Sequence, residues 1–310
     1  MDIRRVTPGE YSRAFAEYPH VFNTVAFSEL NAWKCWQIHY LLISDTRLRA
    51  GFILGETDTA LSSPFSAPFG GPTFTRHQHL TTICAIFRTL NDYAHSLSKD
   101  LRITLPPMWH NPGTLSQCVS ALSILPGAAP VIDVCYHMPL GDSADPLPHS
   151  VARARGALRQ ALARQFTFTV GDASPHLVQR AYDIVKDNHT QRGYPVRMTP
   201  DDMLRTAAMM NADTFFLTTP DGTDAAAAIV FTTLPSVAQP ILWGDNVSLH
   251  DHRTMHRLCF EIARFYAARR YSVLDLGPAS LHGIPDLGLA FFKESLGFTP
   301  SLRYTFHIPR

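Results

Sequence analysis

Strand-like and helix-like runs alternate along this chain in an order that occurs twice. In the first half, "YLLIS" (40–44) and "RAGFILGE" (49–56) are β-rich runs separated by a short polar turn, which predicts a hairpin. Residues 79–98 then carry apolar side chains at helical spacing. "LRITLPP" (101–107) and "VIDVCYHMPL" (131–140) follow as strands. This alternation predicts a fold of the α/β (α+β) class.

The second half follows the same order with different residues. Residues 214–234 read as a strand, a Pro-Asp-Gly turn and a second strand, and 238–246 as a further strand. An amphipathic helix over 250–271 precedes a strand at 272–278. A short helix, "LGLAFFKESLG", and a last strand end the chain. We therefore expect a repeat of architecture rather than of sequence.

An arginine-rich helix is predicted between the halves, at 151–164. A strand and two further helices follow it, with the loop "RGYPV" between those helices. We place the domain boundary before the arginine-rich helix, which divides the chain into 1–145 and 146–310.

Composition limits the class of protein. The chain has 310 residues, of which 45% are hydrophobic and 17% charged, with a formal net charge of +1. This profile predicts a cytoplasmic globular protein without DNA as a partner, and any anionic ligand must be attracted by a local patch. No apolar run approaches the roughly 20 residues of a membrane span, and no signal peptide is recognised. The odd number of cysteines and the absence of CxxC spacing predict reduced thiols: Cys35, Cys84, Cys118, Cys135 and Cys259.

Five stretches, in order, resemble the FemAB-like transferases of the GNAT-type acyltransferase superfamily. They are "FNTVAFSELNAW", "SSPFSAPFGGP", "SVARARGALRQALARQFTFTV", "HTQRGYPVRMTPDDM" and "LDLGPAS…GLAFFKESLGF". Each motif is short, so their order and spacing carry the likeness, which spans nearly the whole chain.

The resemblance implies two tandem GNAT-like domains, each a mixed β-sheet flanked by helices. It implies an enzyme that transfers an aminoacyl or acyl group to an amino group of a peptidoglycan or polysaccharide precursor. The donor substrate would be aminoacyl-tRNA or acyl-CoA, and the acceptor a small-molecule or nucleotide-linked amine; no cofactor is assigned. The coiled-coil arm common in the peptidoglycan enzymes has no counterpart here, which leaves tRNA use and the substrate open.

Acyl transfer to an amine requires a neutral amine and a stabilised oxyanion, and it requires no protein nucleophile. Asp245, in "WGDN", is the candidate base, and a capping role is its alternative. Tyr194, in "HTQRGYPV", could orient the acceptor or donate a proton, or simply pack beyond the helix stop at Gly193. Arg192 of the same loop is a candidate for substrate binding.

Candidates for phosphate binding lie in several segments. By resemblance, Phe292 and Lys293 form the "FK" pair associated with the donor, and the alternative for Lys293 is a solvated lysine. Arg155 and Arg159 share a helix face that could bind the phosphates of a nucleotide-linked acceptor, or could simply be solvated.

A glycine-rich CoA cradle is not visible in the sequence. Gly70 and Gly71 are the candidate glycines of the first half but lie well before the helix, and the matching segment of the second half has no glycine after Gly244. This disfavours a CoA-dependent GNAT N-acyltransferase, which stays an alternative. An inactive double-GNAT binding module is the other alternative.

A metal site is not expected. His250, His252 and His256 lie close together in the sequence, and the last two are four apart on a predicted helix, but no HExxH motif or cysteine set accompanies them.

Overall fold

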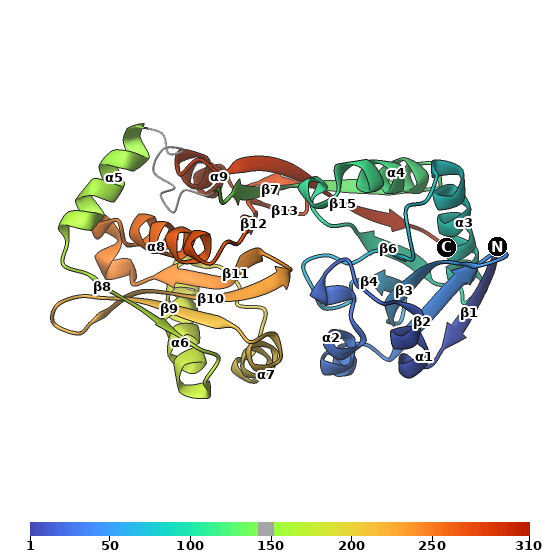
Figure 1. Ribbon diagram of the computed structural model, residues 1–310, viewed down its shortest axis with the longest axis horizontal. Coiled ribbons are helices and arrows are strands. Elements are labelled where there is room, and N and C mark those ends of the chain that lie inside the picture. Colours follow the sequence, from blue (N-terminus) through green and yellow to red (C-terminus); the bar gives the residue numbers. More distant parts are fainter. Residues whose placement is uncertain (142–151) are drawn as a thin grey trace. The chain divides into compact units, whose positions relative to one another are not determined.

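The computed structural model describes residues 1–141 and 152–310, with side chains in the arginine-rich helix from Ala154 onward. The described chain forms two compact units (Figure 1). Unit 1 comprises Met1–Cys135, Ser280–Pro285 and Ser301–Arg310, and unit 2 comprises Tyr136–Ala279 and Asp286–Pro300. The end of the chain thus returns to unit 1. The domains proposed at 1–145 and 146–310 stay a prediction.

Unit 1 contains a mixed sheet in the order β1-β2-β3-β4-β6-β15. Neighbouring strands are antiparallel except β4 and β6, which are parallel and are connected through the long helix α3. The strands are β1 (Asp2–Val6), β2 (Gln37–Ser44), β3 (Leu48–Glu56), β4 (Ala60–Ser63), β5 (Thr73–Phe74), β6 (Asp100–Thr104) and β15 (Thr299–Ile308). The helices are α1 (Pro8–Ala14), α2 (Val25–Leu30), α3 (Leu80–Ser96) and α4 (Pro112–Ser123), and a short pair, β13 (Ser280–Leu281) and β14 (Ile284–Pro285), joins this unit.

Strand alternation divides the unit 1 core between two faces of the sheet. Leu41 and Ile43 of β2 lie in the cluster that contains the apolar residues of α3 and α4. Tyr40 and Leu42 lie in a second cluster with Tyr11 of α1. Successive side chains of a strand point to opposite faces, so one strand serves both clusters.

The strands of unit 2 pair in the order β12-β11-β10-β9-β8. Its strands are antiparallel except β11 and β12, which are parallel and are connected through α8. The strands are β8 (Thr167–Gly171), β9 (Asp213–Thr218), β10 (Asp224–Leu234), β11 (Val237–Asp245) and β12 (Val273–Pro278). The helices are α5 (Ala152–Ala163), α6 (Pro175–Arg192), α7 (Pro200–Met210), the 3-10 helix η5 (Val247–His252), α8 (Thr254–Ala268) and α9 (Leu287–Ser295), and β7 (Ala129–Pro139) has residues in both units.

Small residues in the central strand of unit 2 let helices cover both faces. Ala225–Ala228 of β10 are fully buried. Helices α6 and α8 both contact β10, and Figure 1 shows them on opposite sides of the strand. A methyl group on each face allows the helix backbones to approach closely, while β10 keeps its ladder bonds to β9 and β11.

The two units share one connection pattern: antiparallel strands, a long helix, then a strand parallel to the last one. It runs β2-β3-β4-α3-β6 in unit 1 and β9-β10-β11-α8-β12 in unit 2. The predicted repeat of architecture is therefore confirmed.

Two local predictions require correction. The helix expected over 250–271 is divided, because Arg253 adopts a left-handed φ of 60° between η5 and α8. Lys293 of α9, for which a solvated position was the alternative, is only 1% exposed, while Leu289 of the same helix is half-buried. Among the described residues, no helix is both long and apolar enough to cross a membrane.

Candidate functional site

A buried carboxylate at the end of β11 organises the polar centre of unit 2. Asp245 is 1% exposed, and both of its oxygens accept hydrogen bonds. Asn188 Nδ2 lies 2.8 Å from Oδ1, and Thr254 Oγ1 lies 2.7 Å from Oδ2. His250 Nδ1 lies 3.1 Å from Oδ2, and Arg192 Nη2 lies 3.5 Å from Oδ1. The buried charge is therefore satisfied from several elements at once.

Helix α6 supplies two of these partners because of its periodicity. Asn188 and Arg192 are four residues apart and so lie on one face of the helix. Asn188 Nδ2 also donates to the Asp245 backbone oxygen at 2.7 Å. A Cβ atom at Gly244 would lie 3.2 Å from Asn188 Cγ, so the glycine lets α6 approach the strand end. The helix ends at Gly193, whose φ of 72° suits glycine.

His250 is the half-exposed member of the network. Its Nδ1 is 3.1 Å from Asp245 Oδ2 and also 3.1 Å from Arg192 Nη2. In one tautomer Nδ1–H donates to Asp245 and leaves Nε2 as a proton acceptor. In the other, Nδ1 accepts from Arg192 and Nε2 carries the proton. Its side chain is 52% exposed, so the outer nitrogen can meet a substrate.

The loop after α6 connects this network to α9. Tyr194, half-exposed, donates its hydroxyl proton to Asp286 Oδ2 at 3.3 Å. Asp286 also caps α9, since its Oδ1 accepts from Leu289 N at 2.9 Å. The His189 ring packs edge-on against Tyr194, with centroids 6.0 Å apart. Tyr194 is therefore held by polar and aromatic contacts together.

Phe292 brings α9 back to β11 and α8. Its ring centroid is 6.1 Å from that of Trp243 and 5.1 Å from that of His256. Burial lowers the pKa of His256 to about 4, with the Arg253 charge acting in the same direction. The imidazole is thus neutral at pH 7. These contacts link Asp245, Arg192, Tyr194 and Phe292 through neighbouring residues within unit 2.

Lys293 points into unit 2 rather than into solvent, so the solvated alternative is wrong. Its Nζ donates to the carbonyl oxygens of Leu276, Gly277 and Pro278 at 2.8, 3.1 and 2.9 Å. Nζ also lies 5.8 Å from the Tyr136 ring centroid. These bonds use the three donors of an ammonium group. Lys293, the neighbour of Phe292 in α9, therefore ties this helix to the end of β12.

The remaining predicted binding residues lie elsewhere. Arg155 is half-buried and Arg159 exposed on α5, a helix that packs against α8. Among the described residues, no contact joins Arg159 to Asp245, Tyr194 or Phe292. The side chain of Arg153, on the same helix, lies outside the described residues.

Gly70 and Gly71 belong to unit 1 and have structural contacts there. Gly70 N donates to Thr104 O at 2.8 Å, and a Cβ atom at Gly70 would lie 2.7 Å from Ser63 Oγ. Gly71 has a φ of 100°, and its N donates to the same Ser63 Oγ at 3.0 Å. Close packing and a left-handed backbone thus account for the glycines. A role in ligand binding stays a prediction.

Sequence reasoning missed the residues that complete the network: Asn188, Thr254, Asp286 and Trp243, with His250 considered only as a metal ligand. Asn188 carried a usable signal, since it lies one helical turn before Arg192. Thr254 and Asp286 carried none beyond the helix-start preference of their residue types. Within the described part of the chain, no cluster of His, Cys, Asp and Glu could hold a metal ion.

The fold is shared with solved structures, although no family model and no curated protein matches the sequence. FemX aligns with a TM-score of 0.67 at 12% identity, over 98% of this chain and 97% of FemX. A Bacteroides thetaiotaomicron protein of unknown function aligns at 0.62 and 12% identity, over 99% of both chains. L-PGS from Bacillus licheniformis aligns at 0.59 and 11% identity, over 98% of this chain and 93% of L-PGS. The chain therefore has the FemAB-like α/β fold that the sequence resemblance implied.

Proposed function

We propose that this chain is a transferase that moves an aminoacyl or acyl group to an amino group of a cell-surface precursor, of peptidoglycan or polysaccharide type. The likeness to FemX over nearly the full length of both chains supports this reaction class. The observation that carries the proposal is the Asp245–His250 pair at the end of β11. An acceptor amine must lose a proton, and His250 offers an exposed nitrogen for it.

Asp245 acts through His250 in this proposal. Its oxygens already accept from Asn188, Thr254 and the imidazole, which leaves little room for an incoming ammonium proton. A carboxylate so placed favours the tautomer whose Nε2 is the acceptor. Asp245 is thus a positioning residue, and His250 is the base.

The groups around the base have roles in binding. Arg192, 36% exposed, offers a guanidinium for a phosphate or carboxylate of the acceptor. Tyr194 orients the acceptor through its hydroxyl, or protonates the leaving group. Phe292 provides an apolar surface for the donor, and Lys293 keeps α9 and the end of β12 together. Arg155 and Arg159 stay candidates for longer-range attraction of an anionic substrate.

The donor is aminoacyl-tRNA, with acyl-CoA as the alternative. The acceptor is a small-molecule or nucleotide-linked amine, and the protein acts in the cytoplasm. Neither unit displays a glycine turn at the start of its long helix, since α3 follows His79 and α8 follows Arg253. This feature favours the tRNA-linked donor over CoA.

A direct assay tests the proposal. The purified chain is incubated with labelled aminoacyl-tRNA or acetyl-CoA and with nucleotide-linked precursors that carry a primary amine, and the amide is detected by mass spectrometry. We expect an amide from one donor. No amide from either donor, with a folded protein, contradicts the proposal and favours an inactive binding module.

Matched histidine variants then test the base. His250→Gln should lower kcat at least about 100-fold, in line with the usual contribution of general base catalysis. His252→Gln is the control, because that residue lies two positions away with its ring near Phe166 and outside the Asp245 network. Equal rates for the two variants would remove His250 from the mechanism.

A further inference from the structure

A hollow of about 530 Å³ lies in unit 1, between α1, β1 and the turn that joins β2 to β3. Its apolar residues include Ala14, Leu42 and Leu48. Arg4 pairs in register with Leu42, so its side chain leaves the sheet on the face that carries this hollow. The arginines that line it come from three separate elements: Arg4 of β1, Arg13 of α1 and Arg47 of the turn.

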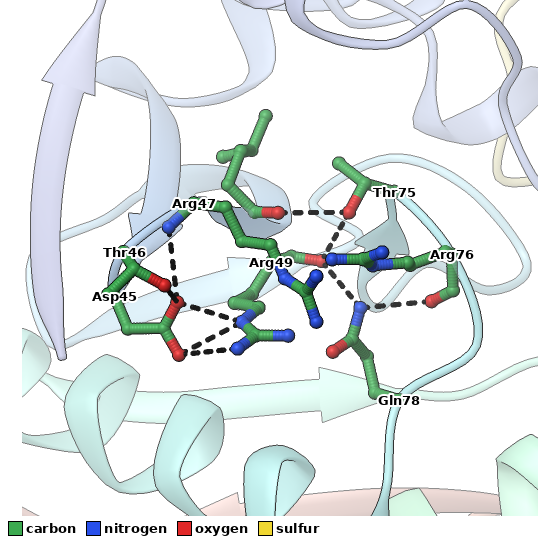
Figure 2. Close-up of polar contacts among 8 residues, drawn as sticks. Asp45, Thr46, Arg47, Arg49, Thr75, Arg76 and Gln78 are labelled. Carbon is green, nitrogen blue, oxygen red and sulfur yellow. Dashed lines mark hydrogen bonds and ion pairs between the residues drawn. The ribbon is translucent and has the colours of Figure 1, made fainter.

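One carboxylate beside the hollow is neutralised from outside it. Figure 2 shows Asp45 facing Arg49, whose Nε is 2.9 Å from both carboxylate oxygens and whose Nη2 is 2.7 Å from Oδ2. Arg49 does not line the hollow. This bidentate pair neutralises the negative charge that Asp45 would otherwise contribute to the hollow.

The other carboxylate that lines the hollow, that of Glu10, accepts hydrogen bonds from Thr7 at the start of its own helix. Glu10 Oε2 accepts from Thr7 N at 2.8 Å and from Thr7 Oγ1 at 2.9 Å, which completes a capping box. The Thr7 backbone hydrogen bond, followed by its hydroxyl, lowers the pKa of Glu10, and the charges of Arg4 and Arg13 contribute in the same direction. Neither arginine forms a hydrogen bond or ion pair with Glu10.

The turn that carries Arg47 is held in shape. Asp45 N donates to Arg47 O at 3.1 Å, and Arg47 N donates to Asp45 Oδ1 at 3.2 Å. The buried amide of Gln78 donates to Arg76 O at 3.0 Å, and Thr75 Oγ1 donates to Leu48 O at 3.0 Å. Figure 2 shows the Arg47 and Arg76 side chains extending toward one another between the two turns.

Within the described residues, the guanidinium groups of Arg4, Arg13 and Arg47 make no hydrogen bond or ion pair. Three lining arginines face the charge of Glu10 alone, since Asp45 is paired with Arg49, and an anion with several oxygens relieves this excess of positive charge. A planar guanidinium matches two phosphate oxygens at once. The apolar residues beneath can hold an organic group attached to the phosphate.

We propose that this hollow binds a phosphorylated small molecule through its phosphate or diphosphate group. Arg4, Arg13 and Arg47 hold the phosphate oxygens, and Leu42 and Leu48 contact the organic part. The site lies wholly in unit 1 and does not rest on the transferase reaction proposed for unit 2.

Calorimetric titration of the full chain with inorganic pyrophosphate and with uridine diphosphate, at low ionic strength, tests the proposal. Uridine serves as the probe without phosphate. Wild-type protein should bind both phosphate probes, should not bind uridine, and should lose affinity as salt is added. Arg13→Ala and Arg47→Ala should each weaken binding about tenfold or more, and the double variant further.

Arg88→Ala is the matched control, because Arg88 is exposed on α3 and its loss changes the net charge equally. Its affinity should equal that of the wild type. Absence of binding by both phosphate probes at millimolar concentration would overturn the proposal. Equal weakening by Arg88→Ala, or unchanged binding in the Arg13 and Arg47 variants, would also overturn it, since the anion would then bind elsewhere or through net charge alone.

Discussion

The Nζ atom of Lys293 lies 2.8 Å from the carbonyl oxygen of Leu276, 17 residues earlier in the chain. The contact belongs to a set of three carbonyl bonds at the end of β12, in a side chain that is 1% exposed. A lysine so placed stabilises the fold whether or not an acyl donor substrate is bound. Its replacement therefore tests folding before it tests catalysis.

Lys293→Ala should lower the free energy of unfolding by about 3 kcal/mol or more, because it leaves buried carbonyl groups without donors and opens a cavity. Lys293→Met keeps most of the side-chain volume, so it isolates the effect of losing the hydrogen-bond donors of the ammonium group. Lys186→Ala, an exposed lysine of α6, should change stability by less than about 0.5 kcal/mol. Urea denaturation followed by circular dichroism measures the stability of all three variants. Equal urea midpoints for Lys293→Ala and Lys186→Ala would contradict the structural role of Lys293.

Asn188→Ala should cost about 1–3 kcal/mol of stability, since Asp245 loses a buried donor. Asn188→Asp should cost more at pH 7, because two carboxylates then face each other. That variant should regain stability as the pH falls, since one carboxyl of the folded pair takes up a proton more readily than it would in the unfolded chain. Gln160→Ala, on the exposed face of α5, is the control. A flat pH response of Asn188→Asp would argue against the contact.

His20 should make the protein acid-sensitive. Burial lowers its pKa to about 3 from an ordinary value of 6.5, against a smaller opposing effect of the Gly70 backbone. Below pH 6.5 the unfolded chain binds a proton that the folded chain does not, so stability falls with pH. From pH 6.5 to pH 5 this amounts to about 2 kcal/mol. His20→Phe keeps a ring beside Phe69 and should flatten the pH dependence of the stability measured by urea denaturation. An unchanged dependence of stability on pH would contradict the lowered pKa of His20.

Two glycine variants should change stability in opposite directions. Gly70→Ala places a methyl group 2.7 Å from Ser63 Oγ and 2.8 Å from the Pro64 backbone nitrogen, so we expect a loss of at least about 1 kcal/mol. Gly156→Ala meets nothing within 4 Å in α5 and should add about 0.5–1 kcal/mol. Thermal melts of both variants measure the difference. A stable Gly70→Ala protein would show that the loop at 63–71 yields to the added methyl.

Local sequence patterns sufficed for the elements and for the fold class. The hairpin of β2 and β3, the helix α3 and the strand β12 lie within a few residues of their predicted ranges, because apolar periodicity is a property of neighbouring residues. The sequence resemblance implied the FemAB-like fold because it used the order of five stretches. The division of the 250–271 helix at Arg253 was missed, since a left-handed residue other than glycine has no local signature.

Of the candidate site, the sequence by itself determined the residue types and their segments: an aspartate after a strand, an arginine and a tyrosine after a helix, and a lysine on the last helix. Only the tertiary structure decided what each side chain meets. Asn188 and Asp245 are 57 residues apart, and Tyr194 and Asp286 are 92 apart. Contacts between residues so far apart in the chain depend on how helices pack on a sheet, and periodicity along the chain does not encode that packing. The burial of Lys293 is the clearest case. A charged side chain is expected to lie in solvent, but here the carbonyl oxygens at the end of β12 replace water as its hydrogen-bond partners.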